Sequence, residues 1–160
     1  METVEVYSDA TWASDTDTSR SISAYKVLIR GAAIDWHCSI QKSVALSSCD
    51  SEYFALSEAA SEAIHIQLAL TELKFKCAKQ WSTKPLLIFE DNQSAINIAN
   101  GGGKHKHLKH IQIRLQYVRE LISAGEIALQ YVPSADNLAD ILTKNLTRMP
   151  FTKLRDNILG

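Results

Sequence analysis

The chain has 160 residues, of which 46% are hydrophobic and 22% are charged, and this composition is typical of one globular domain. Its formal net charge of −1 gives no sign of a nucleic-acid partner, so contact with phosphates would require a local basic patch. No stretch approaches the roughly 18 consecutive apolar residues of a membrane span. Three cysteines without a CxxC pair predict free thiols in a reducing compartment. We expect a single domain over 1–160, with residues 1–3 added by cloning or belonging to a linker.

The first third of the chain is predicted to form three strands. Val4–Trp12 alternates between two faces, and Ile22–Ile29 is rich in residues that favour β-structure. Gly31 marks a turn into the third predicted strand, Ala33–Cys38. The short connections predict an antiparallel meander.

A long helix is predicted next. Ser47 or Ser48 can cap its N-terminus, and Asp50 in the first turn complements the helix dipole. Apolar residues then recur at spacings of three and four, which is typical of a helix that packs one face against a core. The members of this stripe are Leu56, Ala59, Ala63, Ile66, Leu70 and Leu73.

The second half of the chain alternates between strands and helices. Leu86–Phe89 is a continuous apolar run, as expected for a strand buried on both faces. Gln93–Asn100 reads as a short helix that the following glycines stop. The later elements are predicted to be a helix, a strand and two helices: Ile111–Ala124, Ile127–Val132, Leu138–Leu146 and Phe151–Leu159. This order predicts an α/β fold in which helices cover a mixed sheet.

Four acidic residues lie where a purely structural sequence would not place them. Asp9 lies in the first predicted strand, and Glu52, four residues before Leu56, extends the apolar stripe of the long helix. Asp91 follows the buried strand, where open α/β sheets usually build their sites, and Asp140 interrupts an apolar segment. Buried carboxylates are usually paired or bind metal, and Mg²⁺ prefers a cluster of oxygens.

Each of these acids also has a purely structural interpretation. Asp9 could belong to a turn, and Glu52 could be a surface residue on a helix with a different phase. Asp91 could cap the next helix, and Asp140 could favour a helix N-terminus. The residues alone leave open whether the four carboxylates converge.

Eight short motifs occur in order and with regular spacing along the chain. They are Tyr7–Ala10, Gly31–Trp36, Val44–Ser48, Glu52–Ala59, Asp91–Ala95, Lys109–Ile111, Tyr131–Pro133 and Leu138–Lys144. From about Val6 to Leu159, this ordered set resembles the ribonuclease H domain of Ty1/copia-type retrotransposon Pol polyproteins. The resemblance implies a ribonuclease H-like fold with a five-stranded mixed sheet flanked by helices.

The resemblance also implies which residues form the active site. The catalytic and metal-binding acids would be Asp9, Glu52, Asp91 and Asp140, and they would hold two Mg²⁺ ions, for which Mn²⁺ substitutes. The implied reaction is hydrolysis of the RNA strand of an RNA–DNA hybrid during reverse transcription by a two-metal mechanism. Its products would carry 5′-phosphate and 3′-hydroxyl ends.

The fourth acid has a rival in Asp136, which lies only four residues before Asp140. We prefer Asp140 because it occupies the acid of the Ala-Asp-Ile-Leu-Thr-Lys motif of the family. Asn137, between the two, is expected to help orient the site.

Partners and location follow from the same resemblance. The expected partners are the RNA–DNA hybrid and the reverse transcriptase domain of the same polyprotein, without a membrane. The expected location is intracellular, in a cytoplasmic virus-like particle, with the nucleus as a second location. Lys104–His110 is the most basic stretch and is either a phosphate-contacting arm or a solvated loop. The residues expected to contact nucleic acid are Asn92, Gln93, Lys104, Lys106, Lys109, His110 and Arg114.

Several positions depart from the family pattern. Gln112 and Thr11 stand where the family commonly has Asp, and Gln116 replaces a histidine. The basic cluster usual after Trp36 retains only Lys42 as a charged residue. None of these changes removes a proposed metal ligand, but they lower the expected affinity for a hybrid. The alternative function is therefore a catalytically weak or domesticated module that binds nucleic acid or a protein without cutting.

Two tryptophans in the first third have two interpretations. Trp12 and Trp36 could stack on bases or pack in the core. We favour core packing for both.

Overall fold

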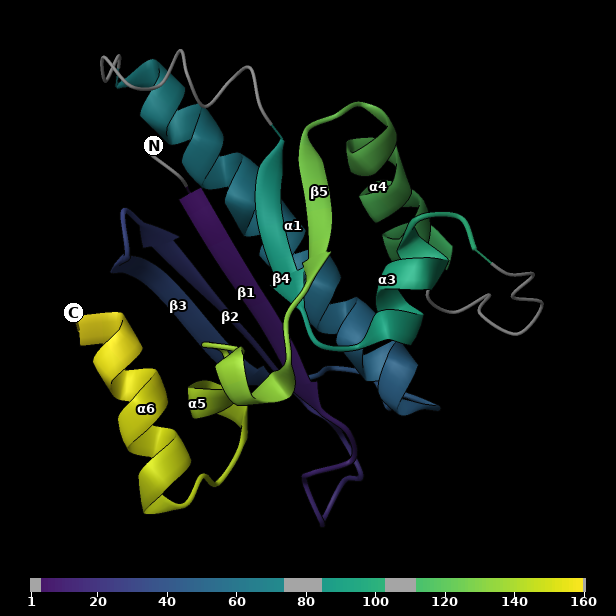
Figure 1. Ribbon diagram of the computed structural model, residues 1–160. Coiled ribbons are helices and arrows are strands. Elements are labelled where there is room, and N and C mark those ends of the chain that lie inside the picture. Colours follow the sequence, from purple (N-terminus) through teal and green to yellow (C-terminus); the bar gives the residue numbers. More distant parts are fainter. Residues whose placement is uncertain (1–3, 74–84, 103–111, 160) are drawn as a thin grey trace.

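The computed structural model describes residues 4–73, 85–102 and 112–159. Five strands form one sheet in the order β3-β2-β1-β4-β5 (Figure 1). The strands are β1 (Val4–Thr11), β2 (Ile22–Ile29), β3 (Ala32–Ile40), β4 (Leu86–Glu90) and β5 (Ile127–Tyr131). The first three are antiparallel neighbours, whereas β4 pairs in parallel with both β1 and β5. The predicted five-stranded mixed sheet is thus confirmed.

The turn between β2 and β3 follows from its two residues. Arg30 and Gly31 both have positive φ angles, of 54° and 79°, which suit the right-handed twist of the strands that they join. Glycine adopts this conformation without strain. The predicted turn at Gly31 is confirmed, and β3 runs past the predicted end at Cys38 to Ile40.

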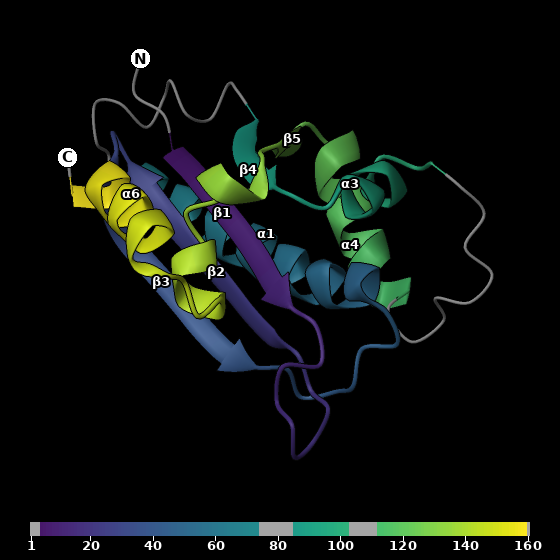
Figure 2. The same cartoon turned by 60° about the horizontal axis from the view of Figure 1, so that its bottom comes forward.

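Helices cover both faces of the sheet (Figure 2). The helices that pack with the main core are α1 (Ser48–Glu72), α3 (Gln93–Ala99) and α4 (Gln112–Ser123). The opposite face is covered by α5 (Asp140–Thr143) and α6 (Arg148–Leu159). Among the described residues, no helix has the length and apolar character needed to cross a membrane.

The main core lies between α1 and the sheet. Val6, Val27 and Ile88 are fully buried there against Leu56 of α1, and burial of each such side chain stabilises the fold by about 1.5–3 kcal/mol. The predicted stripe of α1 is correct for Leu56, Ala59 and Ala63, which are buried, and Ile66 and Leu70 pack at its edge. Leu73 is 68% exposed because α1 has already ended at Glu72.

A smaller core on the other face joins Leu28 to Leu138 and Leu154. The helix predicted over Leu138–Leu146 is present but shorter, because α5 spans only Asp140–Thr143. Just before it, Asn137 holds the chain through its side chain: its Nδ2 donates to the Ser8 carbonyl at 2.8 Å, and its Oδ1 accepts from the Ala139 N–H at 3.1 Å. Side-chain hydrogen bonds to the backbone of this kind are common where helices begin.

The two tryptophans are not core residues. Trp36 is 61% exposed and Trp12 is 51% exposed, so the prediction of core packing is wrong for both. Trp36 lies on β3, an edge strand of the sheet. Trp12 follows the last residue of β1, and its indole N–H donates to the Ala45 carbonyl at 3.0 Å.

Candidate metal centre

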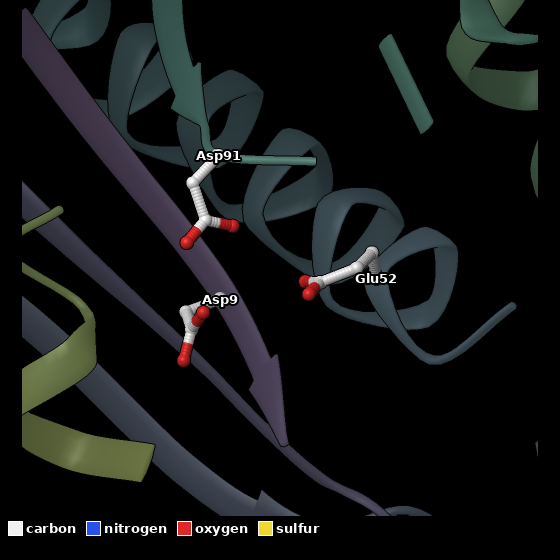
Figure 3. Close-up of side chains that lie close together, drawn as sticks. All are labelled: Asp9, Glu52 and Asp91. Atoms are coloured by element: carbon white, nitrogen blue, oxygen red, sulfur yellow. The ribbon is translucent and has the colours of Figure 1, made fainter. Parts of the chain in front are cut away.

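Two of the predicted acids are placed side by side by the parallel pairing of β1 and β4. Tyr7 of β1 pairs with Phe89 of β4, so Asp9 and Asp91 each lie two residues further along neighbouring strands. Glu52 reaches the same point from the N-terminal part of α1 (Figure 3). One carboxylate oxygen from each of the three residues lies within 4.8 Å of the others. The three acids therefore converge, although they are far apart in the sequence.

The cap of α1 fixes where Glu52 lies. The Ser47 side chain accepts the Asp50 N–H at 3.1 Å, as a helix N-cap does. Ser47, one of the two predicted caps, is thus the residue that begins the helix. Because α1 then packs on β1 through Leu56 and the residues that follow, Glu52 lies beside the C-terminal ends of β1 and β4.

Burial raises the pKa of two of these acids, Asp9 and Glu52. Asp9 is fully buried, and burial raises its pKa to about 6; Asp140 and Asp91 add to this rise, and Lys144 opposes it. Glu52 is 7% exposed, and burial raises its pKa to about 11, with nearby carboxylates contributing. Desolvation disfavours the charged form of a carboxyl, so the protein alone stabilises Glu52 in its protonated form at neutral pH.

The chemistry of the cluster fits a hard divalent cation. Within the part of the chain that the structure describes, Glu52 Oε2 is buried without a hydrogen-bond partner. An unpartnered buried oxygen is costly, and a cation with oxygen ligands would satisfy it. Mg²⁺ binds through one or two carboxylates and retains waters. Asp9, Glu52 and Asp91 are the residues that could hold such an ion.

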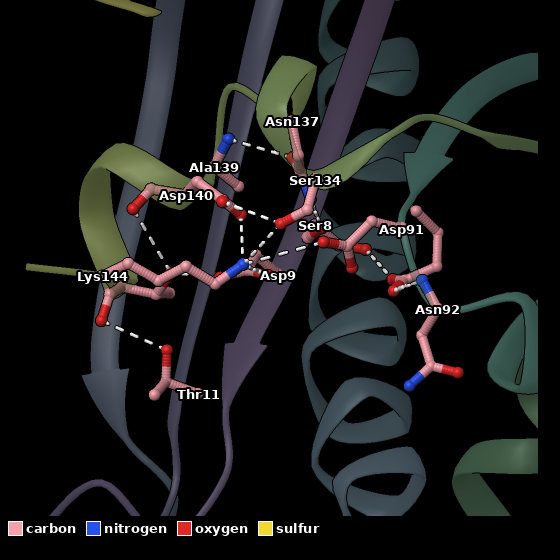
Figure 4. A network of polar contacts seen from close by, with 12 residues as sticks. Ser8, Asp9, Thr11, Asp91, Asn92, Ser134, Asn137, Ala139, Asp140 and Lys144 are labelled. Carbon is pink, nitrogen blue, oxygen red and sulfur yellow. Dashed lines mark hydrogen bonds and ion pairs between the residues drawn. The ribbon is translucent and has the colours of Figure 1, made fainter. Parts of the chain in front are cut away.

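Lys144 is the main cation beside these acids (Figure 4). Its Nζ lies 2.6 Å from Asp140 Oδ1, 3.2 Å from Asp9 Oδ1 and 3.7 Å from Asp91 Oδ2. Burial lowers the pKa of the ammonium group, but the three carboxylates outweigh this effect and raise it above the ordinary value. The sequence pattern predicted no role for Lys144. The available signal was its position four residues after Asp140, which places both on one side of a helix.

The structure separates the two rivals for the fourth acid. Asp140 is buried; its Oδ2 accepts from Ser134 at 3.0 Å, and Lys144 joins it to Asp9. The Asp136 side chain is 49% exposed and pairs with Lys153 at 2.5 Å. Asp140 is therefore the one that lies beside the cluster.

The residues predicted to contact nucleic acid fall into three groups. Asn92, and not Asp91, caps α3, because its Oδ1 accepts the Ala95 N–H at 3.1 Å. Gln93 is exposed at the start of that helix, and Arg114 lies on α4. The other four lie outside the described residues: Lys104, Lys106, Lys109 and His110.

Arg114 helps to line a cavity of about 390 Å³ between α1, α4 and the end of β3, together with Lys42. Its guanidinium lies 4.7 Å from the centre of the Phe54 ring and donates to Ser57 Oγ at 2.7 Å. Glu58 lies 3.7 Å away. These contacts fix the guanidinium at the cavity wall, which Lys42 and Glu58 also line.

Replacing Lys144 by Met is expected to destabilise the metal-free protein. The substitution leaves Asp9 and Asp140 without their cation, and the free energy of unfolding at pH 7 should fall by about 2 kcal/mol, between the values for exposed and buried ion pairs. Lys153→Met is the matched control, because Lys153 pairs with Asp136 at the surface and its loss should change stability by less than about 0.5 kcal/mol. Urea unfolding in EDTA measures both, and equal effects would contradict the special role of Lys144.

Comparison with known proteins finds relatives of this chain, although no family model matches it. The chain is 33% identical over 145 residues to the "Retrovirus-related Pol polyprotein from transposon TNT 1-94" of Nicotiana tabacum, with 91% of the chain covered. It is 34% identical over 155 residues to that of transposon RE1 of Arabidopsis thaliana, with 97% covered. The chain spans 10% of the length of each of these relatives.

Solved structures of low sequence identity share the fold. RNase H1 from Halobacterium salinarum superposes with a TM-score of 0.61 at 18% identity, and LC11-RNase H1 in complex with an RNA/DNA hybrid superposes with 0.63 at 12%. Each match covers 87% of this chain and 92% of the other. The protease-reverse transcriptase of prototype foamy virus matches 99% of this chain and 20% of its own, with a TM-score of 0.53 at 14% identity. This chain thus has the ribonuclease H fold, and its homologues are Ty1/copia-type retrotransposon Pol polyproteins, of which it matches one segment.

Proposed function

We propose that this chain is a magnesium-dependent endonuclease that hydrolyses the RNA strand of RNA–DNA hybrids during reverse transcription. The observation that carries this proposal is the convergence of Asp9, Glu52 and Asp91 at the ends of two parallel strands, with a buried oxygen of Glu52 left unpartnered. The Pol polyprotein relatives and a structural neighbour solved with an RNA/DNA hybrid support the same function.

The four acids have distinct places in the proposed mechanism. Asp9, Glu52 and Asp91 would supply oxygen ligands for two Mg²⁺ or Mn²⁺ ions, and Asp140 would complete the set from α5. Bound ions of this kind activate a water as nucleophile and stabilise the leaving oxygen of a phosphodiester. We infer products with 5′-phosphate and 3′-hydroxyl ends.

Lys144 has a role of its own in this proposal. Its ammonium contacts oxygens of Asp9 and Asp140, so it neutralises part of the acidic charge when no metal is bound. An ammonium and a divalent cation compete for the same oxygens. Metal binding is therefore expected to weaken the contacts of Lys144.

The cavity beside Arg114 supports binding of a hybrid. Lys42 and Arg114 both line it, and a pair of cations suits a backbone phosphate. The net charge of −1 predicts weak, salt-sensitive binding by this domain alone, because affinity for nucleic acid comes largely from phosphate contacts. We propose that the reverse transcriptase domain of the same polyprotein supplies further contacts, inside a virus-like particle.

A cleavage assay tests the proposed function. Labelled RNA–DNA hybrid, RNA duplex and DNA duplex of one sequence are incubated at low salt with Mg²⁺, with Mn²⁺ and with EDTA. We expect cutting of the RNA strand of the hybrid with either metal, none with EDTA, and none of either duplex. A folded protein that binds the hybrid but cuts it with neither metal would instead support a binding module that has lost catalysis.

A further inference from the structure

A fifth acid, Glu90, lies beneath the cluster and has no place in the mechanism above. It is the last residue of β4 and is completely buried. Burial raises its pKa to about 8, with Asp91 and Asp9 adding to the rise and hydrogen bonds from Ser8 and Asn92 opposing it. A carboxyl is costly to bury even when hydrogen-bonded, so its presence at this point of the core requires an explanation.

The two oxygens of Glu90 bind the chain on either side of the cluster. Ser8 Oγ donates to Glu90 Oε2 at 2.5 Å, and the Asn92 N–H donates to Glu90 Oε1 at 3.1 Å. Ser8 directly precedes Asp9 on β1, and Asn92 directly follows Asp91. One side chain thus connects the neighbours of two proposed metal ligands, one on β1 and one just after β4.

The sheet itself does not make this connection. The ladder between β1 and β4 is last registered at Tyr7 and Phe89, before either acid is reached. The ladder between β4 and β5 ends at Glu90. Beyond these pairs, the Glu90 side chain accepts the Asn92 N–H. This hydrogen bond holds the backbone just past the point where the ladder hydrogen bonds end.

The connection extends to the third segment of the site (Figure 4). The Ser8 carbonyl accepts from Asn137 Nδ2 at 2.8 Å, and Asn137 Oδ1 accepts the N–H of Ala139, the residue before Asp140. Ser8 and Asn137 are completely buried, as Glu90 is. Polar networks of this kind, when satisfied, rigidify the groups that they join.

We propose that Glu90 is a positioning residue, whose carboxyl sets the spacing of Asp9 and Asp91 by holding Ser8 and the Asn92 backbone. The identity of Asp9 and Asp91 as metal ligands rests on the function proposed above. Residues that orient metal ligands without touching the metal commonly change metal affinity 10–100-fold when they are replaced.

Two substitutions at Glu90 separate positioning from charge. Glu90→Gln removes the ability to ionise but keeps an oxygen that can accept the Asn92 N–H and an amide that can donate to Ser8 Oγ. Glu90→Leu removes both hydrogen bonds at similar volume. Mn²⁺ affinity measured by calorimetry should fall about tenfold or more in the Leu protein and stay within about threefold of the unsubstituted protein in the Gln protein. Equal losses in the two proteins would assign the effect to charge and overturn the proposal.

A metal-free readout tests the same contact independently. In EDTA, hydrogen exchange of the Asn92 N–H should be about tenfold faster in the Leu protein, because one hydrogen bond of ordinary strength is lost. Unchanged exchange would overturn the positioning role, whether or not metal binds. Ser8→Ala removes one of the two contacts and should weaken Mn²⁺ binding relative to the unsubstituted protein, though less than Glu90→Leu does. If the Leu protein does not fold, unchanged Mn²⁺ affinity in Ser8→Ala would overturn the proposal. An unsubstituted protein that binds no Mn²⁺ would overturn the proposed function, and the exchange result would still decide the role of Glu90.

Discussion

An Asp91→Asn protein is expected to lose cleavage of the hybrid by about three orders of magnitude or more while keeping its fold. Asparagine has the size of aspartate but offers one neutral oxygen in place of a carboxylate. The loss corresponds to about 4 kcal/mol of transition-state stabilisation, within the several kcal/mol that a bound metal ion supplies. The fold should persist because Asp91 lies just beyond β4 and Asn92, not Asp91, caps α3.

The measurement is the initial rate of RNA-strand cleavage with Mg²⁺, together with the thermal midpoint of unfolding. Asp136→Asn is the matched control, since it makes the same chemical change at a side chain that is 49% exposed and paired with Lys153. We expect the control to cut the hybrid at close to the unsubstituted rate. Cleavage by Asp91→Asn at the unsubstituted rate would remove Asp91 from the site, and loss of cleavage in Asp136→Asn would reopen the choice of the fourth acid.

The sequence predicted the fold best where the periodic pattern of a segment matches the position of that segment in the folded structure. The alternation of β1, the apolar run of β4 and the stripe of α1 predicted the sheet and its covering helix. Asp9, Glu52 and Asp91 were conspicuous by their places in these elements: Asp9 lies in β1, Glu52 extends the α1 stripe, and Asp91 directly follows β4. Their convergence was not visible, since it depends on the parallel pairing of β1 with β4, which brings residues about eighty positions apart together.

The wrong predictions have physical causes that lie outside local pattern. Trp36 has the hydrophobicity of a core residue, but β3 is at the edge of the sheet, and strand order cannot be read from the residues of one strand. The helix predicted over Leu138–Leu146 begins only at Asp140, after Asn137 has bound the Ser8 backbone, far away in the sequence. Contacts of this kind override local propensity.

Two polar residues were missed for a similar reason. Glu90 follows an apolar run and reads as the polar end of a strand, and Lys144 reads as an ordinary helix-end cation. Their roles arise from what the fold places beside them: Ser8 for Glu90, and Asp9 for Lys144. A buried partner on another element leaves no trace in the local sequence of either residue.

A Glu52→Gln protein is expected to lose cleavage and yet to be more stable than the unsubstituted protein when metal is removed at alkaline pH. Burial raises the pKa of Glu52 in the folded state to about 11, from an ordinary value of 4.5. The folded state therefore binds a proton that the unfolded state releases, and stability falls as pH rises wherever this is so. The contribution of Glu52 is fully present below pH 4.5 and is lost progressively through the window between 4.5 and about 11.

Glutamine cannot ionise, so the variant avoids this loss. In EDTA at pH 8 its free energy of unfolding should exceed that of the unsubstituted protein by up to about 5 kcal/mol, a rise of about 10 °C or more in the thermal midpoint for a chain of this size. The difference should shrink toward zero at pH 4.5. Asp9, whose pKa is raised to about 6 by burial, titrates in both proteins. Its contribution to the pH dependence of stability therefore largely cancels when the two proteins are compared.

Added Mg²⁺ should act in the opposite sense. A ligand that binds only the folded state stabilises it in proportion to its occupancy, so Mg²⁺ should raise the midpoint of the unsubstituted protein more than that of Glu52→Gln. Glu126→Gln, at an exposed carboxylate before β5, is the control and should change stability by less than about 0.5 kcal/mol at either pH. A variant that is less stable than the unsubstituted protein in EDTA at pH 8 would show that Glu52 is held charged without metal. The opposite result would mean that the Glu52 carboxylate destabilises the metal-free fold and is retained because it binds the ion.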